Sequence, residues 1–331
     1  MHQTPSTRDD AFRSAVASAF VARLPGVAIL DVDGADAAAF LQGQFSNDVA
    51  ALGPGEARWA TYNSPKGRML ATFLVWRPVA GPAYRMAVAS DLAEPMRKRL
   101  SMFVLRSKAV LTVPALDALG VGGPEARSAL KAALGAESAP LRAVPLAGAE
   151  AVGLPDGRIL IAAPAERSAA LLDRLSAAAT PADEAPWRWL AIRSGVAEVR
   201  LATSERHVAQ AGNWDVNGAL SFTKGCYPGQ EVVARMQHLG ILKERAHPFH
   251  LDGDPPAPAT PLYGAVFGEQ ACGSVVDAVA LPGGGSDLLA VVQSKAVEGG
   301  DLRCGAPDGP LLVPIALPYA LPASAPKRVR L

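Results

Sequence analysis

The residue types that could do chemistry are concentrated in one short segment. Residues 224–231 read KGCYPGQE, so two glycines and a proline surround a single cysteine and predict a shaped loop. Residues 230–236 have helix-forming character, with Glu231 in the first turn, where a helix dipole favours an acid. The segment therefore places Cys226 close to the start of a helix.

Two features of this segment would activate a cysteine. Lys224 lies two residues before Cys226, and Arg235 follows on the predicted helix. Cationic neighbours and a helix N-terminus both favour the thiolate, which is the form that reacts and binds metals. The other interpretation is an inert, buried thiol, because free cysteine is among the most buried residue types.

Further basic side chains could form a groove with this loop. Residues 63–67 read NSPKG, and these residue types favour a turn. The turn lies between two predicted strands, so we expect a hairpin whose tip presents Lys66 and Arg68. Together with Lys224 and Arg235 they are candidates for a basic groove. For each residue alone, a solvated surface charge is the alternative.

Two amide side chains lie in a stretch without helical period. Gln210 and Asn213 flank Gly212 in a predicted loop. Amides present both donors and acceptors, so they could bind the hydrogen-bonding edge of a heterocycle or equally cap local turns.

The cysteine set favours a reducing compartment. Cys226, Cys272 and Cys304 are odd in number and widely spaced, which is not a disulfide framework and suits the cytoplasm. No Cys-x-x-Cys pair occurs, so we expect no metal site completed by this chain alone. Cys272 and Cys304 are interpreted as structural.

The cysteine segment also carries a resemblance. Residues 224–235, KGCYPGQEVVAR, resemble the signature of the YgfZ family of folate-binding proteins. Upstream, FLQGQ at 40–44 with Asn47-Asp48, NSPKGR at 63–68, IRSG at 192–195 and the stretch 210–213 are similar to the family's corresponding segments. The similarity runs over roughly residues 25–320.

This resemblance implies a fold, a cofactor and partners. The family is related to the aminomethyltransferase of the glycine cleavage system, which implies an α+β ring of three modules around a central channel where tetrahydrofolate can sit. It implies a role in assembling or repairing iron–sulfur clusters of client enzymes, including one that modifies tRNA. Cys226 would be the functional thiol, by transient iron or cluster ligation or by disulfide exchange. Neither DNA nor a membrane is an expected partner.

The residues expected around the folate are basic, amide or signature residues. They are Lys66, Arg68, Arg193, Gln210, Asn213, Lys224, Tyr227, Gln230, Glu231 and Arg235.

The chain departs from its relatives at two places. Where the aminomethyltransferases carry an acidic pair it has Ala71 and Thr72, which cannot act as general acid or base, so we expect no aminomethyl transfer. Where folate-binding relatives often carry a glutamate it has Arg193, which offers only donors and could instead hold an anionic tail. A folate-dependent one-carbon transferase and a scaffold with a vestigial channel are therefore the alternative functions.

Three modules must position these residues. Short strands and helices over 25–115 predict an N-terminal folate-binding-type module, and a second α+β region over 116–240 carries the signature. Residues 241–331 are proline-rich, show short apolar runs and predict a small β-barrel.

Composition limits the class of protein. The 331 residues include 32 basic and 31 acidic side chains, a formal net charge of +1, which excludes disorder and a wholly nucleic-acid-binding surface. The apolar run 14–22 is too weak for a secretion signal, and prolines break the run 311–326, so a cytoplasmic protein without a membrane span is expected.

Overall fold

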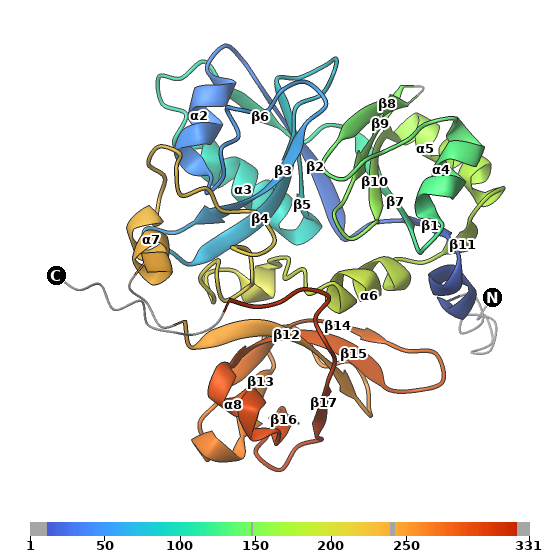
Figure 1. Ribbon diagram of the computed structural model, residues 1–331. Helices are drawn as coiled ribbons and strands as arrows, with labels where there is room; N and C mark the ends of the chain where they lie inside the picture. The colour runs from blue at the N-terminus through green and yellow to red at the C-terminus, as the bar shows by residue number, and fades with distance from the viewer. Residues whose placement is uncertain (1–11, 147, 239–241, 323–331) are drawn as a thin grey trace.

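The computed structural model describes residues 12–146, 148–238 and 242–322. Two β-sheets with their helices lie side by side, and a third, strongly curved sheet lies below them (Figure 1). Helix α6 (Ala185–Arg193) runs between the upper sheets and the lower one.

The first sheet carries the predicted hairpin. Its strands, in order across the sheet, are β3 (Ala57–Asn63), β4 (Met69–Trp76), β5 (Tyr84–Ala89), β2 (Val27–Asp33) and β6 (Val110–Thr112). Helices α2 (Ala37–Gln44) and α3 (Ser90–Ser101) accompany it. Every residue of β4 is buried, as its almost wholly apolar sequence predicts for a central strand.

The second sheet begins before the first one in the chain. Its order is β11 (Thr180–Ala182), β1 (Phe20–Arg23), β7 (Leu116–Gly122), β10 (Ile159–Pro164), β9 (Ala149–Gly153) and β8 (Ala143–Leu146). Strand β1 is parallel to β11 and antiparallel to β7. The chain of the first sheet is therefore an insertion between two neighbouring strands of the second.

Local sequence signals shape the turns and helix ends of this region. Asp156 and Gly157 form the turn between β9 and β10, with Gly157 at φ 88°. Helix α4 (Ala126–Leu134) ends at Gly135, which adopts the left-handed conformation at φ 68° that glycine tolerates best. Helix α5 (Ala165–Ser176) follows β10 directly.

The C-terminal sheet is a nearly closed barrel, which confirms the predicted one. Its order is β16 (Leu302–Cys304), β13 (Pro261–Gly264), β14 (Gly273–Ala280), β15 (Ser286–Gln293), β12 (Glu244–Leu251) and β17 (Leu312–Pro314). A bridge between Arg303 and Leu311 joins its two edges. Helix α8 (Ser294–Gly299) packs against it, and Cys272 and Cys304 lie buried in its core.

The segment after α6 returns to the first sheet. The backbone N–H of Met69 donates to the His207 carbonyl at 2.8 Å, and Arg68 forms a bridge with Val208. The Trp214 ring lies 5.1 Å from that of Trp59. Before these contacts the segment forms a short 3-10 turn, η1 (Leu201–Thr203), and after them it ends in α7 (Gln230–His238). The signature segment is thus placed by β3 and β4, although it follows the second sheet in the chain.

The predicted boundary between the second and third modules, at 240/241, lies outside the described residues. Among the helices of 12–146, 148–238 and 242–322, none has the length and apolar character to cross a bilayer.

Candidate functional site

Cys226 is exposed between two buried neighbours. The side chains of Lys224 and Tyr227 are 9% and 7% exposed, while Cys226 and the preceding Gly225 face solvent. The Lys224 ammonium lies 4.9 Å from the centre of the Tyr227 ring. Because both ends of the loop are anchored, the thiol is presented from a fixed position.

Lys224 attaches this loop to the end of α2. Its Nζ donates to the carbonyl of Gln42 at 2.5 Å and to that of Phe45, so it satisfies carbonyls that a helix C-terminus leaves free. Burial lowers the pKa of Lys224 to about 8, while the Asp48 carboxylate and the Cys226 sulfur act in the opposite direction. Burial also raises the pKa of Tyr227 to about 12. Lys224 is therefore a structural link as well as a nearby cation.

The hairpin tip lies directly against this segment. Gly229 has φ 78°, and a Cβ added there would meet the Ser64 carbonyl oxygen at 2.4 Å and the Gly67 Cα at 2.7 Å. A Cβ added to Gly67 would lie 2.7 Å from Cβ of Val232 on α7. Only glycines allow this approach, which brings the tip beside the first turn of α7.

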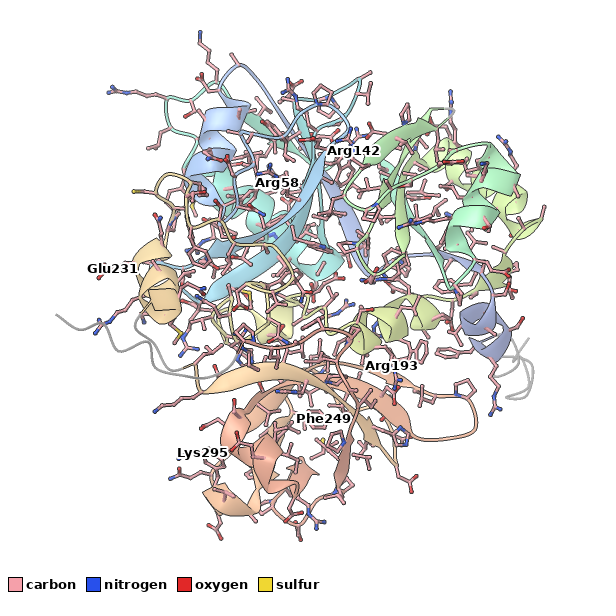
Figure 2. The ribbon with its side chains drawn as sticks, viewed as in Figure 1. Arg58, Arg142, Arg193, Glu231, Phe249 and Lys295 are labelled. Atoms are coloured by element: carbon pink, nitrogen blue, oxygen red, sulfur yellow. The ribbon has the colours of Figure 1, made fainter. Side chains whose placement is uncertain are left out.

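The two elements together present what we call the cysteine face. It consists of exposed residues of the tip, the loop and α7: Lys66, Arg68, Cys226, Glu231 and Arg235. Arg68 donates to the Arg206 carbonyl, which fixes its position. Glu231 projects from the first turn of α7 at the edge of the molecule (Figure 2), and Gln230, which starts this helix, is partly buried.

Gln210 and Asn213 lie beneath this face as buried connectors. Gln210 Nε2 donates to the Val233 carbonyl of α7 at 2.7 Å. Asn213, at φ 60°, donates through Nδ2 to the Ala246 carbonyl of the barrel at 2.8 Å. Both amides thus link segments that are distant in the chain, and Gln210 Oε1 is buried without a hydrogen-bond partner.

Arg193 lies apart from the cysteine face. It ends α6 above the barrel, whereas Glu231 lies on α7 on the other side of the molecule (Figure 2). Its guanidinium is 3.5 Å from the Asp287 carboxylate and 5.6 Å from the Trp189 ring centre. The buried Asp287 also accepts from Trp189 Nε1 at 2.9 Å. Arg193 thus belongs to the joint between α6 and the barrel.

A polar hollow lies where the two sheets, α6 and the barrel meet. It measures about 360 Å³ including its opening to solvent. Its charged lining residues are Arg158, Glu184, Arg188, Glu198, Arg200 and Asp277. Arg188 Nε donates to Asp277 at 3.1 Å, and Glu184 accepts from the Gly26 N–H at 3.1 Å, so most of these charges are already paired.

Glu198 occupies the centre of this region. It lines the polar hollow and two adjacent ones, an apolar hollow beside Trp59, Leu74 and Trp187 and a smaller hollow beside Met69. Its side chain is partly buried, and 27% of its surface is accessible to solvent. Burial raises the pKa of Glu198 above the usual glutamate value. A titratable group with a perturbed pKa in a junction cavity is a typical feature of a ligand site.

The sequence alone did not indicate Glu198, because a single glutamate in an irregular stretch has no distinguishing spacing. Only the meeting of distant segments gives it a role. Within the described ranges, no three His, Cys, Asp or Glu side chains come together as a metal site.

The fold defines the class of protein. The structure is similar to the glycine cleavage system aminomethyltransferase T of Bartonella henselae, with a TM-score of 0.73 and 14% identity, covering 93% of this chain and 87% of that one. The chain therefore has the aminomethyltransferase fold, as expected.

Sequence comparison places it more closely. The chain is 34% identical over 227 residues to the tRNA-modifying protein YgfZ of Sodalis glossinidius, covering 65% of this chain and 66% of that protein. It is 31% identical over 224 residues to the Klebsiella pneumoniae protein of the same name, covering 65% and 67%. The match spans about two thirds of the length of these relatives. No family model matches the chain. The chain belongs to the YgfZ family.

Proposed function

We propose that this protein is a tetrahydrofolate-binding accessory protein for the assembly or repair of iron–sulfur clusters in client enzymes, including tRNA-modifying ones. In this proposal Cys226 is the functional thiol and acts on cytoplasmic clients. The names of the relatives, which refer to tRNA modification, support the client class.

The observation that carries the proposal is the presentation of Cys226. A cysteine that serves packing is buried, as Cys272 and Cys304 are at 2% and 6% exposure, and burial raises the pKa of both thiols. Cys226 is instead exposed on a loop anchored by Lys224 and Tyr227. An exposed thiol beside cationic side chains suits reaction or ligation rather than packing.

The cluster is cargo in this proposal rather than a resident cofactor. Clusters are held by several thiolates, and Cys226 supplies one. The remaining ligands would come from the client or a small thiol, which requires the cysteine face to be open to another molecule. The exposure of Cys226, and of Lys66, Glu231 and Arg235 on the adjoining elements, agrees with this requirement.

The donor set of the polar hollow fits tetrahydrofolate. The pterin ring offers N–H donors, for which Glu184 and Glu198 are acceptors, and the glutamate tail is anionic, for which Arg188 and Arg200 are donors. When bound, tetrahydrofolate would supply a one-carbon carrier. The chain's own residues would bind and orient it.

The two positions at which aminomethyltransferases carry an acidic pair, Ala71 and Thr72, do not support the transferase alternative. Ala71 is fully buried in β4, and the Thr72 hydroxyl accepts from the Val199 N–H at 3.0 Å. Neither side chain can exchange a proton with a substrate amine at neutral pH.

Complementation tests the proposal. In a host lacking its own copy, the activity of an iron–sulfur enzyme is measured after supplying wild type, Cys226→Ala or Thr223→Ala at equal soluble level. Thr223 is an exposed residue of the same loop and serves as the matched control.

Rescue by wild type and Thr223→Ala but not by Cys226→Ala supports the proposal. Equal rescue by all three keeps the pathway and rejects Cys226 as the functional thiol. Failure of every variant, with purified protein turning over a folate-bound one-carbon unit, rejects the accessory role in favour of the transferase.

A further inference from the structure

We propose that Glu198 recognises the ligand of the central hollow, by accepting hydrogen bonds from the N–H groups of a flat heterocycle that carries an anionic tail. This inference deepens the proposed function and rests on it. It assigns the recognition of the heterocyclic ring to a residue that the family resemblance did not indicate.

The position of Glu198 separates two environments. On one side is the apolar hollow, of about 340 Å³ including its opening to solvent, with Trp59 and Trp187 among its walls. On the other side is the polar hollow with Arg188 and Arg200. A flat ring suits the apolar side, an anionic tail suits the arginines, and the carboxylate stands between them, where the polar edge of the ring would lie.

The Glu198 carboxylate is not used by the fold. Its ion pair with Arg158 Nη2 is long, at 3.9 Å, and the same Nη2 lies 2.8 Å from Asp156. Among the residues of the described ranges, no side chain or backbone group donates a hydrogen bond to it. The other two acids of the hollow differ, because Glu184 accepts from Gly26 and Asp277 is held by Arg188.

A partly buried carboxylate without a protein donor is costly to keep. Leaving a charged group desolvated and unpaired destabilises a fold, and burial raises the pKa of this carboxyl accordingly. A ligand with N–H donors would supply the missing partners. The residue is therefore better explained by binding than by packing.

Arg193 does not compete for this role. Its guanidinium contacts Asp287 and Trp189 at the barrel joint, and it is not among the residues that line the three hollows. The residue that brings a carboxylate to the hollows is Glu198, five positions after Arg193. The chain turns between them at Gly195, which has φ 64°.

The hollow is narrow as its side chains stand, so a ring enters when a neighbour moves. Arg200 is suited to this movement, because its ion pair with Asp277 is long, at 3.6 Å, and its side chain is 22% exposed. Once displaced from Asp277, its guanidinium is free to pair with the anionic tail.

Calorimetric titration of the full chain with tetrahydrofolate, kept reduced under anaerobic conditions, tests the inference. Glu198→Gln keeps the shape but replaces one acceptor oxygen by a donor, so binding should weaken roughly 10- to 100-fold. Glu269→Gln, an exposed barrel position, is the matched control and should bind as wild type does.

A second probe, p-aminobenzoylglutamate, carries the tail without the ring, and Glu198→Gln should leave its affinity unchanged. Thermal melts confirm that each variant is folded, and Glu198→Asp, which keeps the charge, should recover part of the affinity.

The outcomes separate the inference from the proposed function. If wild type and Glu198→Gln bind tetrahydrofolate equally, or if the tail probe weakens as much as the whole molecule, the role of Glu198 is rejected while folate binding stands. If wild type does not bind tetrahydrofolate, the folate part of the proposed function and the inference both fail.

Discussion

Gly229 of the cysteine segment lies against Gly67 of the β3–β4 hairpin, so closely that a Cβ on Gly229 would come within 2.7 Å of the Gly67 Cα. The two glycines are 162 positions apart in the chain (229 − 67). Their contact lets the hairpin tip support the loop that presents Cys226. The glycine of the signature is thus explained by a backbone contact rather than by chemistry.

Replacing Gly229 by alanine should therefore destabilise the protein by about 3 kcal/mol, from the strained φ and the clash with the hairpin. Urea unfolding measures this change. Gly225→Ala in the same loop is the control, because nothing lies within 4 Å of its added Cβ, and it should cost less than about 0.5 kcal/mol. Equal effects of the two substitutions would refute the packing role of Gly229.

The three thiols should differ sharply in reactivity. Cys226 is exposed, whereas Cys272 and Cys304 are buried with raised pKa values. A thiol reagent should modify one cysteine of the folded protein rapidly and the other two only after denaturant is added. Cys226→Ala should remove the rapid phase and change the free energy of unfolding by less than about 0.5 kcal/mol. A rapid phase that survives this substitution would contradict the assignment.

The buried Lys224 predicts a stability change at alkaline pH. Its pKa is about 8 in the folded chain, against an ordinary value of 10.5. Between these values the unfolded chain holds more protons than the folded one, so the contribution of Lys224 to stability rises with pH, by up to about 3 kcal/mol. The free energy of unfolding of wild type minus that of Lys224→Met, measured by urea titration from pH 7 to 10, should increase above pH 8. A constant difference would show that Lys224 keeps its ordinary pKa.

Glu198 predicts the opposite pH dependence. Burial raises its pKa in the folded state, so its contribution to stability is present below the ordinary glutamate value of 4.5 and is lost as pH rises through the raised pKa. Glu198→Gln should therefore melt higher than wild type at pH 7 and equally near pH 4. A variant that melts lower than wild type at pH 7 would mean that the Arg158 contact stabilises the fold after all.

Local signals made much of the fold predictable. The almost wholly apolar run of β4, the Asp-Gly turn between β9 and β10, and the glycine that ends α4 each specify their own structure over a few residues. Helix α3 is harder to delimit from local signals, because it begins at Ser90, where Asp91 supplies the first-turn acid, and contains Pro95 in its interior.

Strand β7 could not be predicted, because its glycines look like a linker. Gly120 lies inside the strand and Gly122 ends it, and Cβ atoms added there would meet Trp187 at 2.6 Å and Phe20 at 2.4 Å, respectively. Both positions are glycine so that rings from distant segments can lie on the strand. The packing of a ring on a glycine far away in the chain cannot be predicted from a single sequence.

The same limit applies to the site. The glycines, proline and cysteine of residues 224–231 are neighbours in sequence, so the loop could be predicted. The role of Glu198 depends on β2, β4, α6 and β14 meeting around it, and those contacts join segments far apart in the chain.

Strand β1 has a consequence for how the protein emerges from the ribosome. Residues 20–23 are synthesised before both of their partners, because the antiparallel partner β7 begins at residue 116 and the parallel partner β11 at residue 180. At bacterial-type rates of about 5–20 residues per second, this strand waits on the order of 10 seconds for a partner while the whole first sheet is completed. The first sheet is therefore expected to fold on the nascent chain before the second, while β1 is still unpaired.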